Sequence, residues 1–297
     1  TAPVVTLKGE AQMAVQAGEA FTDPGATATD NLDGDLTAKI VVTGAVDSAK
    51  PGDYTLTYTA TDAAGNKAEV TRKVTVADTI VPVITLAGEA DQTLEAGGTF
   101  TDAGATATDS FEGDLTSKIV TAGTVDTSTL GTYTLTYDVT DAAGNKAVQV
   151  TRKVTVADIT APVITLAGDA ALDAEAGSVY TDAGATAADS FEGDLTAKIA
   201  IVNSVDTTKL GSYTVTYNVA DASGNNATEV TRAVTVKDTT APVITLTGGS
   251  QIDVEAGTAF SDPGVAAADS FEGDLTSKIA VAGSVDTSKL GEYTLTY

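Results

Sequence analysis

The chain of 297 residues contains no cysteine, no histidine and no tryptophan, and only one methionine. Without histidine or cysteine it has no Ser-His catalytic pair, no thiol nucleophile, and no zinc, haem or iron–sulfur site of the usual type. Basic residues are also scarce, because 16 Lys and Arg stand against 41 Asp and Glu, a formal net charge of −25. Nucleic-acid binding needs a basic surface, so this balance argues against it. No apolar run approaches the ~20 residues of a membrane-spanning helix.

A repeat of about 80 residues is present instead. Prolines at positions 3, 82, 162 and 242 lie in the segments TAPVVTL, IVPVITL, TAPVITL and TAPVITL, at spacings of 79, 80 and 80 residues. Aromatic residues recur in the same register, so the period is a property of the whole unit. We therefore expect four domains, at 1–78, 79–158, 159–238 and 239–297, of which the fourth lacks the last strand.

Each unit has the pattern of short antiparallel strands. The segment GTYTLTYDVTD alternates, with Tyr133, Leu135, Tyr137 and Val139 on one face. β-Branched and aromatic residues with a period of 2, separated by turns with Gly and Asp, are typical of strands. The fold class expected is all-β, a tandem array of immunoglobulin-like Greek-key β-sandwiches of about 80 residues each. Gly131 and Tyr133 open the long strand as in a tyrosine corner.

Two further strands are expected in each unit. FTDAGATATD is expected to be one strand with a kink at Asp-Ala-Gly, and Lys118 is expected to open the next, SKIVTAGTVD. The phenylalanine of the loop DSFEGD is expected to pack in the core or at a junction between units.

The segments ITLAGEADQTLEAGGTFTDAGATATDSFEGDLTSKI and GTYTLTYDVTDAAGNKA resemble the bacterial surface immunoglobulin-like repeat, a relative of hyalin-type repeats. The resemblance extends over the whole chain, which contains four consecutive copies of the repeat. It implies an extracellular β-sandwich used in tandem, as in adhesins, surface-layer and stalk proteins, and spacers of secreted enzymes.

Acidic residues recur in three places that the strand order brings to one pole of a sandwich. These are the incoming linker, the loop DSFEGD (109–114) and the loop DAAGN (141–145). Converging carboxylates repel each other, and no base recurs in these loops to compensate them. The candidate metal ligands are Asp30, Asp33, Asp35, Asp62, Asn66, Asp78, Asp109, Glu112, Asp114, Asp141, Asn145, Asp158, Asp189, Glu192, Asp194, Asp221, Asn225, Asp238, Asp269, Glu272 and Asp274.

Ca²⁺ is the cofactor that this pattern favours, because it takes 6–8 oxygen ligands from carboxylates, amides and carbonyls, whereas Mg²⁺ keeps several waters. The alternative is local turn chemistry. Asp35 and Asp114 are suited to cap a short turn, and DAAGN to form a hairpin turn in which Gly and Asn adopt positive φ. Both interpretations can hold together, because a capping carboxylate has a second oxygen free.

The three arginines, Arg72, Arg152 and Arg232, recur at one position and share a strand face with valines. We expect ion pairs with Asp23, Asp102 and Asp182, with the arginine stems on the edge of the core. An anion-binding role is the alternative.

These observations predict a non-enzymatic structural rod, a spacer of a bacterial surface adhesin, extracellular and rigidified by Ca²⁺ between domains. An acid set repeated every 80 residues argues against catalysis, since an active site usually occurs once. The expected partners are the neighbouring repeats, with no nucleic acid and no membrane span, and the ligand of the adhesive tip lies outside this segment. The alternative is a self-assembling surface-layer, sheath or fibre protein, in which another copy donates the strand that the fourth unit lacks. We expect an excerpt of a longer array instead.

Overall fold

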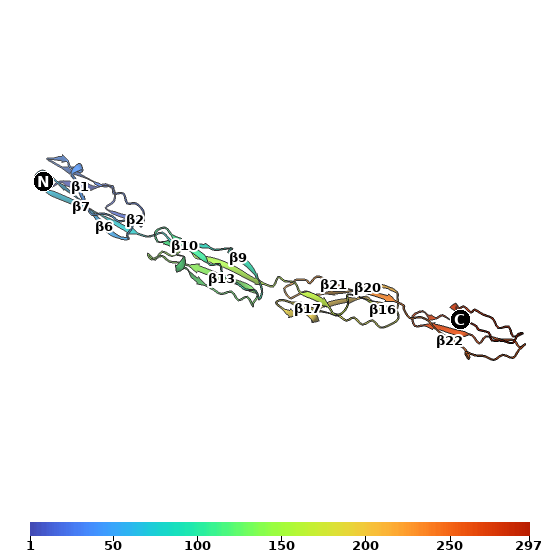
Figure 1. Ribbon diagram of the computed structural model, residues 1–297. Helices are drawn as coiled ribbons and strands as arrows, with labels where there is room; N and C mark the ends of the chain where they lie inside the picture. Colours follow the sequence, from blue (N-terminus) through green and yellow to red (C-terminus); the bar gives the residue numbers. More distant parts are fainter. The chain divides into compact units, whose positions relative to one another are not determined.

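The protein is described by a computed structural model that covers residues 1–297. It divides into two compact units, Thr1–Asp158 and Ile159–Tyr297, which hold two repeats each. Figure 1 shows strands throughout, with helix confined to single 3-10 turns.

The first unit contains repeats 1 and 2. Repeat 1 comprises β1 (Val4–Leu7), β2 (Gln12–Gln16), β3 (Ala26–Asp30), β4 (Gly34–Asp35), η1 (Thr37–Lys39), β5 (Val41–Thr43), β6 (Gly52–Thr61) and β7 (Lys67–Ala77). Repeat 2 comprises β8 (Val83–Leu86), β9 (Asp91–Glu95), β10 (Ala105–Asp109), β11 (Gly113–Asp114), η2 (Thr116–Lys118), β12 (Val120–Ala122), β13 (Gly131–Asp138) and β14 (Val150–Ala157).

The second unit contains repeats 3 and 4. Repeat 3 comprises β15 (Val163–Leu166), β16 (Ala171–Glu175), β17 (Ala185–Asp189), β18 (Gly193–Asp194), η3 (Thr196–Lys198), β19 (Ala200–Asn203), β20 (Gly211–Asn218) and β21 (Val230–Lys237). Repeat 4 comprises β22 (Val243–Leu246), β23 (Val265–Asp269), β24 (Gly273–Asp274) and η4 (Thr276–Lys278).

Two sheets make each of the first three repeats. In repeat 1 the orders are β1-β3-β4 and β2-β7-β6-β5, and in the second sheet β2 runs parallel to β7 while the other pairs are antiparallel. Figure 1 shows β2, β6 and β7 side by side. Val5 of β1, Ala26 of β3 and Leu56 of β6 pack into one core. The predicted β-sandwich is confirmed, and apolar residues alternating along the strands build it.

The tyrosine corner is also confirmed. Tyr133 Oη donates to the carbonyl of Thr129 at 2.8 Å, and the corresponding tyrosines of the other three repeats make the same bond four residues back. On β13, Leu135 and Tyr137 are buried, as is Val139 just beyond it, as their alternation predicts.

Two expectations about the strands were wrong, and one strand was not predicted. Strand β10 begins only after Gly104, whose φ of 75° breaks the extended backbone of the FTDAG segment. Lys118 ends the 3-10 helix η2 instead of opening a strand. Strand β9, with the sequence DQTLE, is an element that the alternation does not reveal, because only Leu94 in it is strongly apolar.

The arginines are more deeply placed than expected. Arg72, Arg152 and Arg232 are all 0% exposed, and each forms the predicted ion pair, with Asp23, Asp102 and Asp182 respectively. In repeat 1 the guanidinium also donates to the carbonyls of Glu10 (3.1 Å) and Gly25 (3.2 Å). The arginine therefore lies inside the sandwich and satisfies carbonyls between the sheets, so it is unavailable to an external anion.

Candidate metal centres

Three aspartates converge where repeat 1 leads into repeat 2. Asp78 directly follows β7, Asp109 ends β10, and Asp141 lies in the loop between β13 and β14. One carboxylate oxygen from each lies within 4.8 Å of the others, and the three residues are 6%, 7% and 6% exposed. The linker and the two loops thus meet at one pole, as the strand order predicts.

Two of these carboxylates have an oxygen with no protein partner. Asp109 Oδ1 accepts from the backbone N–H groups of Phe111 (2.7 Å) and Glu112 (3.0 Å), whereas its Oδ2 is buried and unpaired. Asp78 Oδ2 is likewise buried and unpaired. No lysine or arginine forms a salt bridge with Asp78, Asp109 or Asp141. Buried anionic oxygens without partners are costly, so the group is suited to a cation.

Asn145 holds the third carboxylate in place. Its backbone N–H donates to Asp141 Oδ1 and its Nδ2 to Oδ2, both at 2.7 Å, and Nδ2 also lies 3.1 Å from the carbonyl oxygen of Asp78. Burial of Asp141 opposes ionisation, but these hydrogen bonds outweigh it and lower the pKa of the carboxyl. The amide thereby connects the 141–145 loop to the linker.

Glu112 and Asp114 are directed elsewhere. Glu112 Oε1 accepts from the N–H of Ala142 at 2.6 Å, and Oε2 pairs with Lys118 at 2.9 Å, so this side chain connects the two loops. Asp114 Oδ1 accepts from the N–H of Thr116, the first residue of η2, at 2.9 Å, so this carboxylate takes part in the short turn where the sequence predicts it, although the N-cap position itself is Leu115. In the DAAGN turn Gly144 has a φ of 95°, but no residue other than glycine has a positive φ, so the expected positive φ of the asparagine is wrong.

The same local arrangement recurs in the other repeats. In repeat 1, Asn66 donates to both oxygens of Asp62 at 2.7 Å, Asp30 Oδ1 accepts from Leu32 and Asp33, Asp33 accepts from Ala63, and Asp35 caps η1. In repeat 3, Asp189, Glu192, Asp194 and Asp221 have the corresponding partners, and Asn225 donates to Asp221. In repeat 4, Asp269 and Asp274 accept the corresponding backbone bonds and Glu272 faces Lys278. By register Asp158 is the counterpart of Asp78.

A further polar position escaped the sequence interpretation. Gln16, the last residue of β2, donates from Nε2 to Asp78 Oδ1 at 2.7 Å, and its Oε1 accepts from the N–H of Thr79 at 3.0 Å. Its counterpart in repeat 3 is Glu175, which ends β16 beside the linker residue Asp238. The signal was available in the sequence, because QAG at 16–18 recurs as EAG at 95–97, 175–177 and 255–257.

The junction between repeats 3 and 4 has an acid where the first junction has an amide. Hydrogen bonds from Thr239 and Thr240 lower the pKa of Glu175 to about 2. Burial and the charge of Asp269, and to a smaller extent the charges of Glu175 and Glu272, raise the pKa of Asp238 and outweigh the hydrogen bond from Thr240, which lowers it. The linker carboxylate there is surrounded by like charge.

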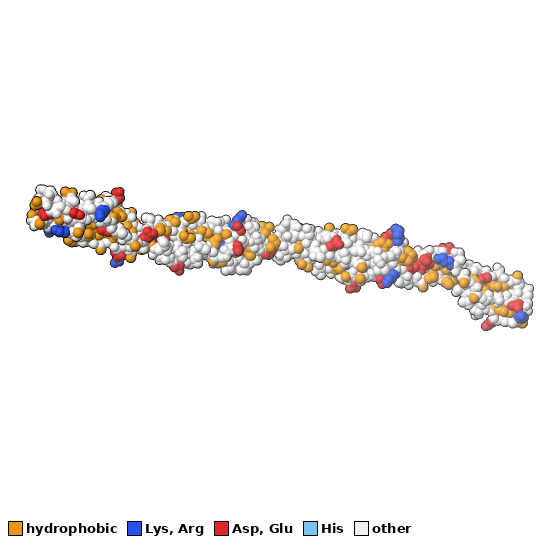
Figure 2. Space-filling model, turned by 90° about the horizontal axis from the view of Figure 1, so that it is seen from above, with side chains coloured by type: hydrophobic (Ala, Val, Ile, Leu, Met, Phe, Trp, Pro, Cys, Tyr) orange, Lys and Arg blue, Asp and Glu red, His pale blue; other side chains and the backbone are white.

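Apolar packing accompanies the polar contacts. The ring of Phe111 in repeat 2 lies against Gly18 of repeat 1, where a β-carbon would come within 3.4 Å of it. Phe271 lies in the same way near Gly177, at 4.0 Å from such a carbon. Phe111 and Phe271 therefore pack at junctions. On the face shown in Figure 2, acidic side chains form small separate groups, some of them beside Lys or Arg, and most of the surface between them is uncharged.

The fold and these clusters define a class of protein: β-sandwiches in tandem with acidic groups where one repeat leads into the next. The profile of the family described as bacterial surface protein, Ig-like domain, matches residues 5–76, 84–156, 164–236 and 244–297, and the chain belongs to this family. The resemblance and the immunoglobulin-like fold class inferred from the sequence are confirmed. Family membership indicates a bacterial surface protein with a structural role, and no helix has the length and apolarity to cross a membrane.

Two curated relatives are similar over most of this chain. The pesticidal crystal protein Cry22Aa of Bacillus thuringiensis is 35% identical over 289 residues, which are 91% of this chain and 38% of that protein. Hyalin of Strongylocentrotus purpuratus is 28% identical over 276 residues, 86% of this chain and 22% of that protein. The chain thus spans well under half the length of either relative. Among solved structures, the protocadherin gammaB7 EC3-6 cis-dimer structure is 14% identical, with a TM-score of 0.31 over 92% of this chain and 84% of that one.

Proposed function

We propose that the chain is a non-enzymatic spacer segment of a bacterial surface adhesin, exposed outside the cell, in which Ca²⁺ bound at the linkers holds consecutive repeats in a fixed relation. The observation that supports this most directly is the buried group Asp78, Asp109 and Asp141, with the unpaired Oδ2 atoms of the first two.

The donor set favours a hard cation. All three side chains offer carboxylate oxygens, and the backbone carbonyl of Asp78 lies 3.1 Å from Nδ2 of Asn145, the residue that holds Asp141. Ca²⁺ accepts many oxygen ligands in flexible geometry, whereas Mg²⁺ requires a near-ideal octahedron and usually keeps several waters. A site formed by loops from different parts of the chain suits Ca²⁺ better, because its ligands need not meet strict angles.

A cation here would act on the linker. Asp78 belongs to the connection that leaves repeat 1, whereas Asp109 and Asp141 belong to repeat 2. Binding all three to one ion therefore restricts the motion of one repeat relative to the next, and the binding free energy is shared with that geometry. The recurrence of the acids at each linker extends the effect along the array.

The proposal is tested by Ca²⁺ binding and thermal unfolding of the 297-residue chain, with Ca²⁺ and with EDTA. Asp109→Asn keeps an oxygen for the N–H groups of Phe111 and Glu112 but removes the charge and the free anionic oxygen. We expect Asp109→Asn to reduce the number of Ca²⁺ ions bound and to lower the Tm in Ca²⁺ but not in EDTA.

The matched control is Asp126→Asn. Asp126 Oδ1 accepts from the N–H of Ser128 at 3.0 Å, so the substitution removes the same charge from a similar turn outside the cluster. Its effect should be equal in Ca²⁺ and in EDTA. A wild-type chain that binds no Ca²⁺ in the millimolar range, with a Tm indifferent to EDTA, would contradict the proposal. Small-angle scattering should also show a longer maximum dimension in Ca²⁺ than in EDTA.

A further inference from the structure

The residue that ends the second strand of a repeat occupies a fixed place beside the outgoing linker. Gln16 of β2 is the register partner of Ala77 on the parallel strand β7, and Asp78 comes next in the chain. In repeat 3, Glu175 of β16 is the partner of Lys237 on β21, and Asp238 follows. In repeats 1 and 3 the parallel pairing thus places the side chain of the strand-end residue, Gln16 or Glu175, beside the carboxylate of the outgoing linker.

The amide and the carboxylate at this place make different contacts. Gln16 donates to Asp78 Oδ1 and accepts from Thr79, so it supplies the linker acid with a neutral hydrogen-bond donor. Glu175 has no hydrogen to donate. Its oxygens accept from the backbone N–H groups of Thr239 (3.0 Å) and Thr240 (3.1 Å) and from both threonine hydroxyls.

The consequence is a difference in which groups carry charge, at two junctions that also differ because residues 239–297 have no counterpart of the loop that supplies Asp141. The first junction combines three aspartates with an amide, whereas the junction of repeats 3 and 4 combines Asp238 and Asp269 with the carboxylate of Glu175. A carboxylate in place of the amide removes a protein donor from the linker acid and adds a negative charge. Cation sites built from oxygen ligands are tuned by the number of charged ligands.

We propose that this strand-end residue, Gln16 in repeat 1 and Glu175 in repeat 3, is a further element of the linker sites and sets how strongly each junction takes up a divalent cation. The inference rests on the proposed Ca²⁺ sites. On this inference the junction after repeat 1, which has Gln16, binds the cation more weakly than it would with a glutamate. Glu95 occupies the same position in repeat 2, so by register it should strengthen cation binding there.

Gln16→Glu in the full chain tests the inference, in a background with Asp189→Asn and Asp269→Asn to weaken the other junctions. We expect the Ca²⁺ affinity measured by calorimetry at low ionic strength to rise about tenfold, because a charged ligand is added. In EDTA the same variant should have a lower Tm than its parent, because Asp78 loses its donor and gains a like charge. Glu175→Gln in the otherwise wild-type chain should weaken Ca²⁺ binding, the opposite of the effect of Gln16→Glu.

Gln12→Glu is the matched control, since Gln12 is exposed at the other end of the same strand. It should leave both the affinity and the EDTA result nearly unchanged. If the parent binds Ca²⁺ and Gln16→Glu binds it no more tightly than Gln12→Glu does, the inference is overturned and the proposed function stands. If the wild-type chain binds no Ca²⁺, the proposed function fails and this inference fails with it.

Discussion

Repeats 3 and 4, which belong to the same compact unit, have similar sequences as far as Tyr217 and Tyr297 but differ in structure. The small sheet forms in both, as β15-β17-β18 and as β22-β23-β24. The four-stranded sheet β16-β21-β20-β19 forms only in repeat 3, whereas in repeat 4 a single bridge joins Ala282 and Thr296. Residues 239–297 contain no counterpart of β21, so the second sheet depends on that strand and the first sheet does not.

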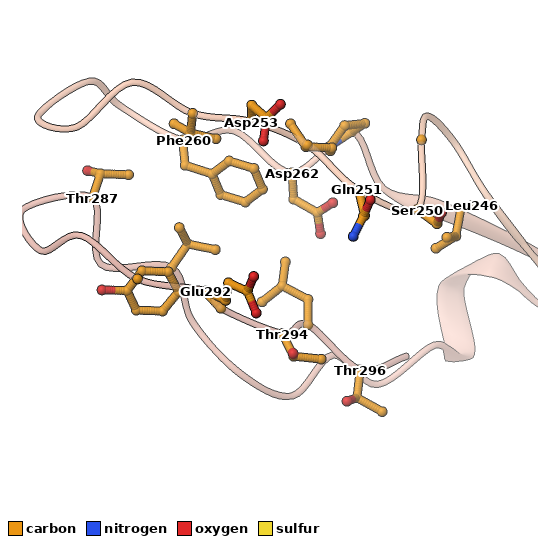
Figure 3. Close-up of a pocket in the computed structure, with 18 of the residues that line it drawn as sticks. Leu246, Ser250, Gln251, Asp253, Phe260, Asp262, Thr287, Glu292, Thr294 and Thr296 are labelled. Atoms are coloured by element: carbon orange, nitrogen blue, oxygen red, sulfur yellow. The ribbon is translucent and has the colours of Figure 1, made fainter.

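The uncovered side of repeat 4 shows what β21 contributes. A hollow of about 820 Å³ is lined by Phe260 and Asp262 on one side and by Glu292 and Thr294 on the other, as Figure 3 shows. Ile244 is 48% exposed, whereas its counterpart Ile164 is 8% exposed. In repeat 3 strand β21, which carries Arg232, occupies the corresponding space and pairs with β16 on one side and β20 on the other.

Of the substitutions considered, Arg232→Met should have the largest effect. It should destabilise the four-stranded sheet of repeat 3, so that repeat 3 comes to resemble repeat 4, in which that sheet does not form. Arg232 pairs with Asp182 and donates to the carbonyls of Asp169 (3.0 Å) and Gly184 (3.2 Å). Removing one member of a buried pair costs about 3–5 kcal/mol, since the other charge is left unpaired. Hydrogen exchange of the amides in β16, β20 and β21 should accelerate about a hundredfold or more.

Lys237→Met is the control for that substitution, in the same strand. Lys237 pairs with Asp173 on the surface, at 51% and 63% side-chain exposure, so its loss should cost under about 1 kcal/mol. The amides of repeat 2 in the same sample provide an internal reference. Equal acceleration in the two variants would show that the buried arginine is not what holds the sheet together.

The sequence predicts the arginine–aspartate pairs but not their depth. Alternation places Arg232 on the valine face, and the charge favours the edge of the core over its interior. Complete burial is possible because backbone carbonyls from two loops meet at the guanidinium, and that encounter is a tertiary property. Strand β16, the counterpart of β9 in repeat 3, was also not predicted: its pairing partner β21 lies some 60 residues away, and the local pattern carries little of that information.

In the candidate metal sites, too, some features could be predicted from the sequence and others depend on tertiary contacts. Strand order was sufficient to bring Asp78, Asp109 and Asp141 to one pole, because alternating strand direction fixes which loops share an end. It could not separate these inward carboxylates from Glu112, which bonds to the neighbouring loop instead. That distinction depends on side-chain length and on the N–H groups exposed by each turn. Gln16 was missed because it enters from a strand that was not predicted.

Acid should destabilise repeat 3 by protonating Asp182, the ion-pair partner of Arg232. Burial of Asp182 opposes ionisation, but hydrogen bonds from Tyr217 and Tyr180 and the charge of Arg232 outweigh it, so its pKa lies below the ordinary 3.8. A lowered folded-state pKa contributes stability that is complete above the unfolded value and is lost as the pH falls through the folded value. Protection of β21 amides in EDTA should therefore change little between pH 7 and 5 and decline below about pH 4.

Asp182→Asn is the control for that titration. It removes the titrating group, so the variant should be less protected at neutral pH and should lose less protection between pH 5 and 3 than the wild type. A parallel decline in the two proteins would assign the acid sensitivity to other carboxyls of repeat 3.

The smallest effect concerns the tyrosine corner, which both repeats retain. Tyr213 donates to the carbonyl of Lys209 at 3.0 Å and Tyr293 to that of Lys289 at 3.2 Å, although only repeat 3 has the full second sheet. The bond spans four residues, so it forms without β21. Tyr213→Phe should cost about 1 kcal/mol, the usual contribution of one hydrogen bond, measured by urea unfolding with local exchange. Tyr293→Phe should alter exchange only near residues 289–293, and a wider loss across repeat 4 would mean that the corner helps to hold the small sheet as well.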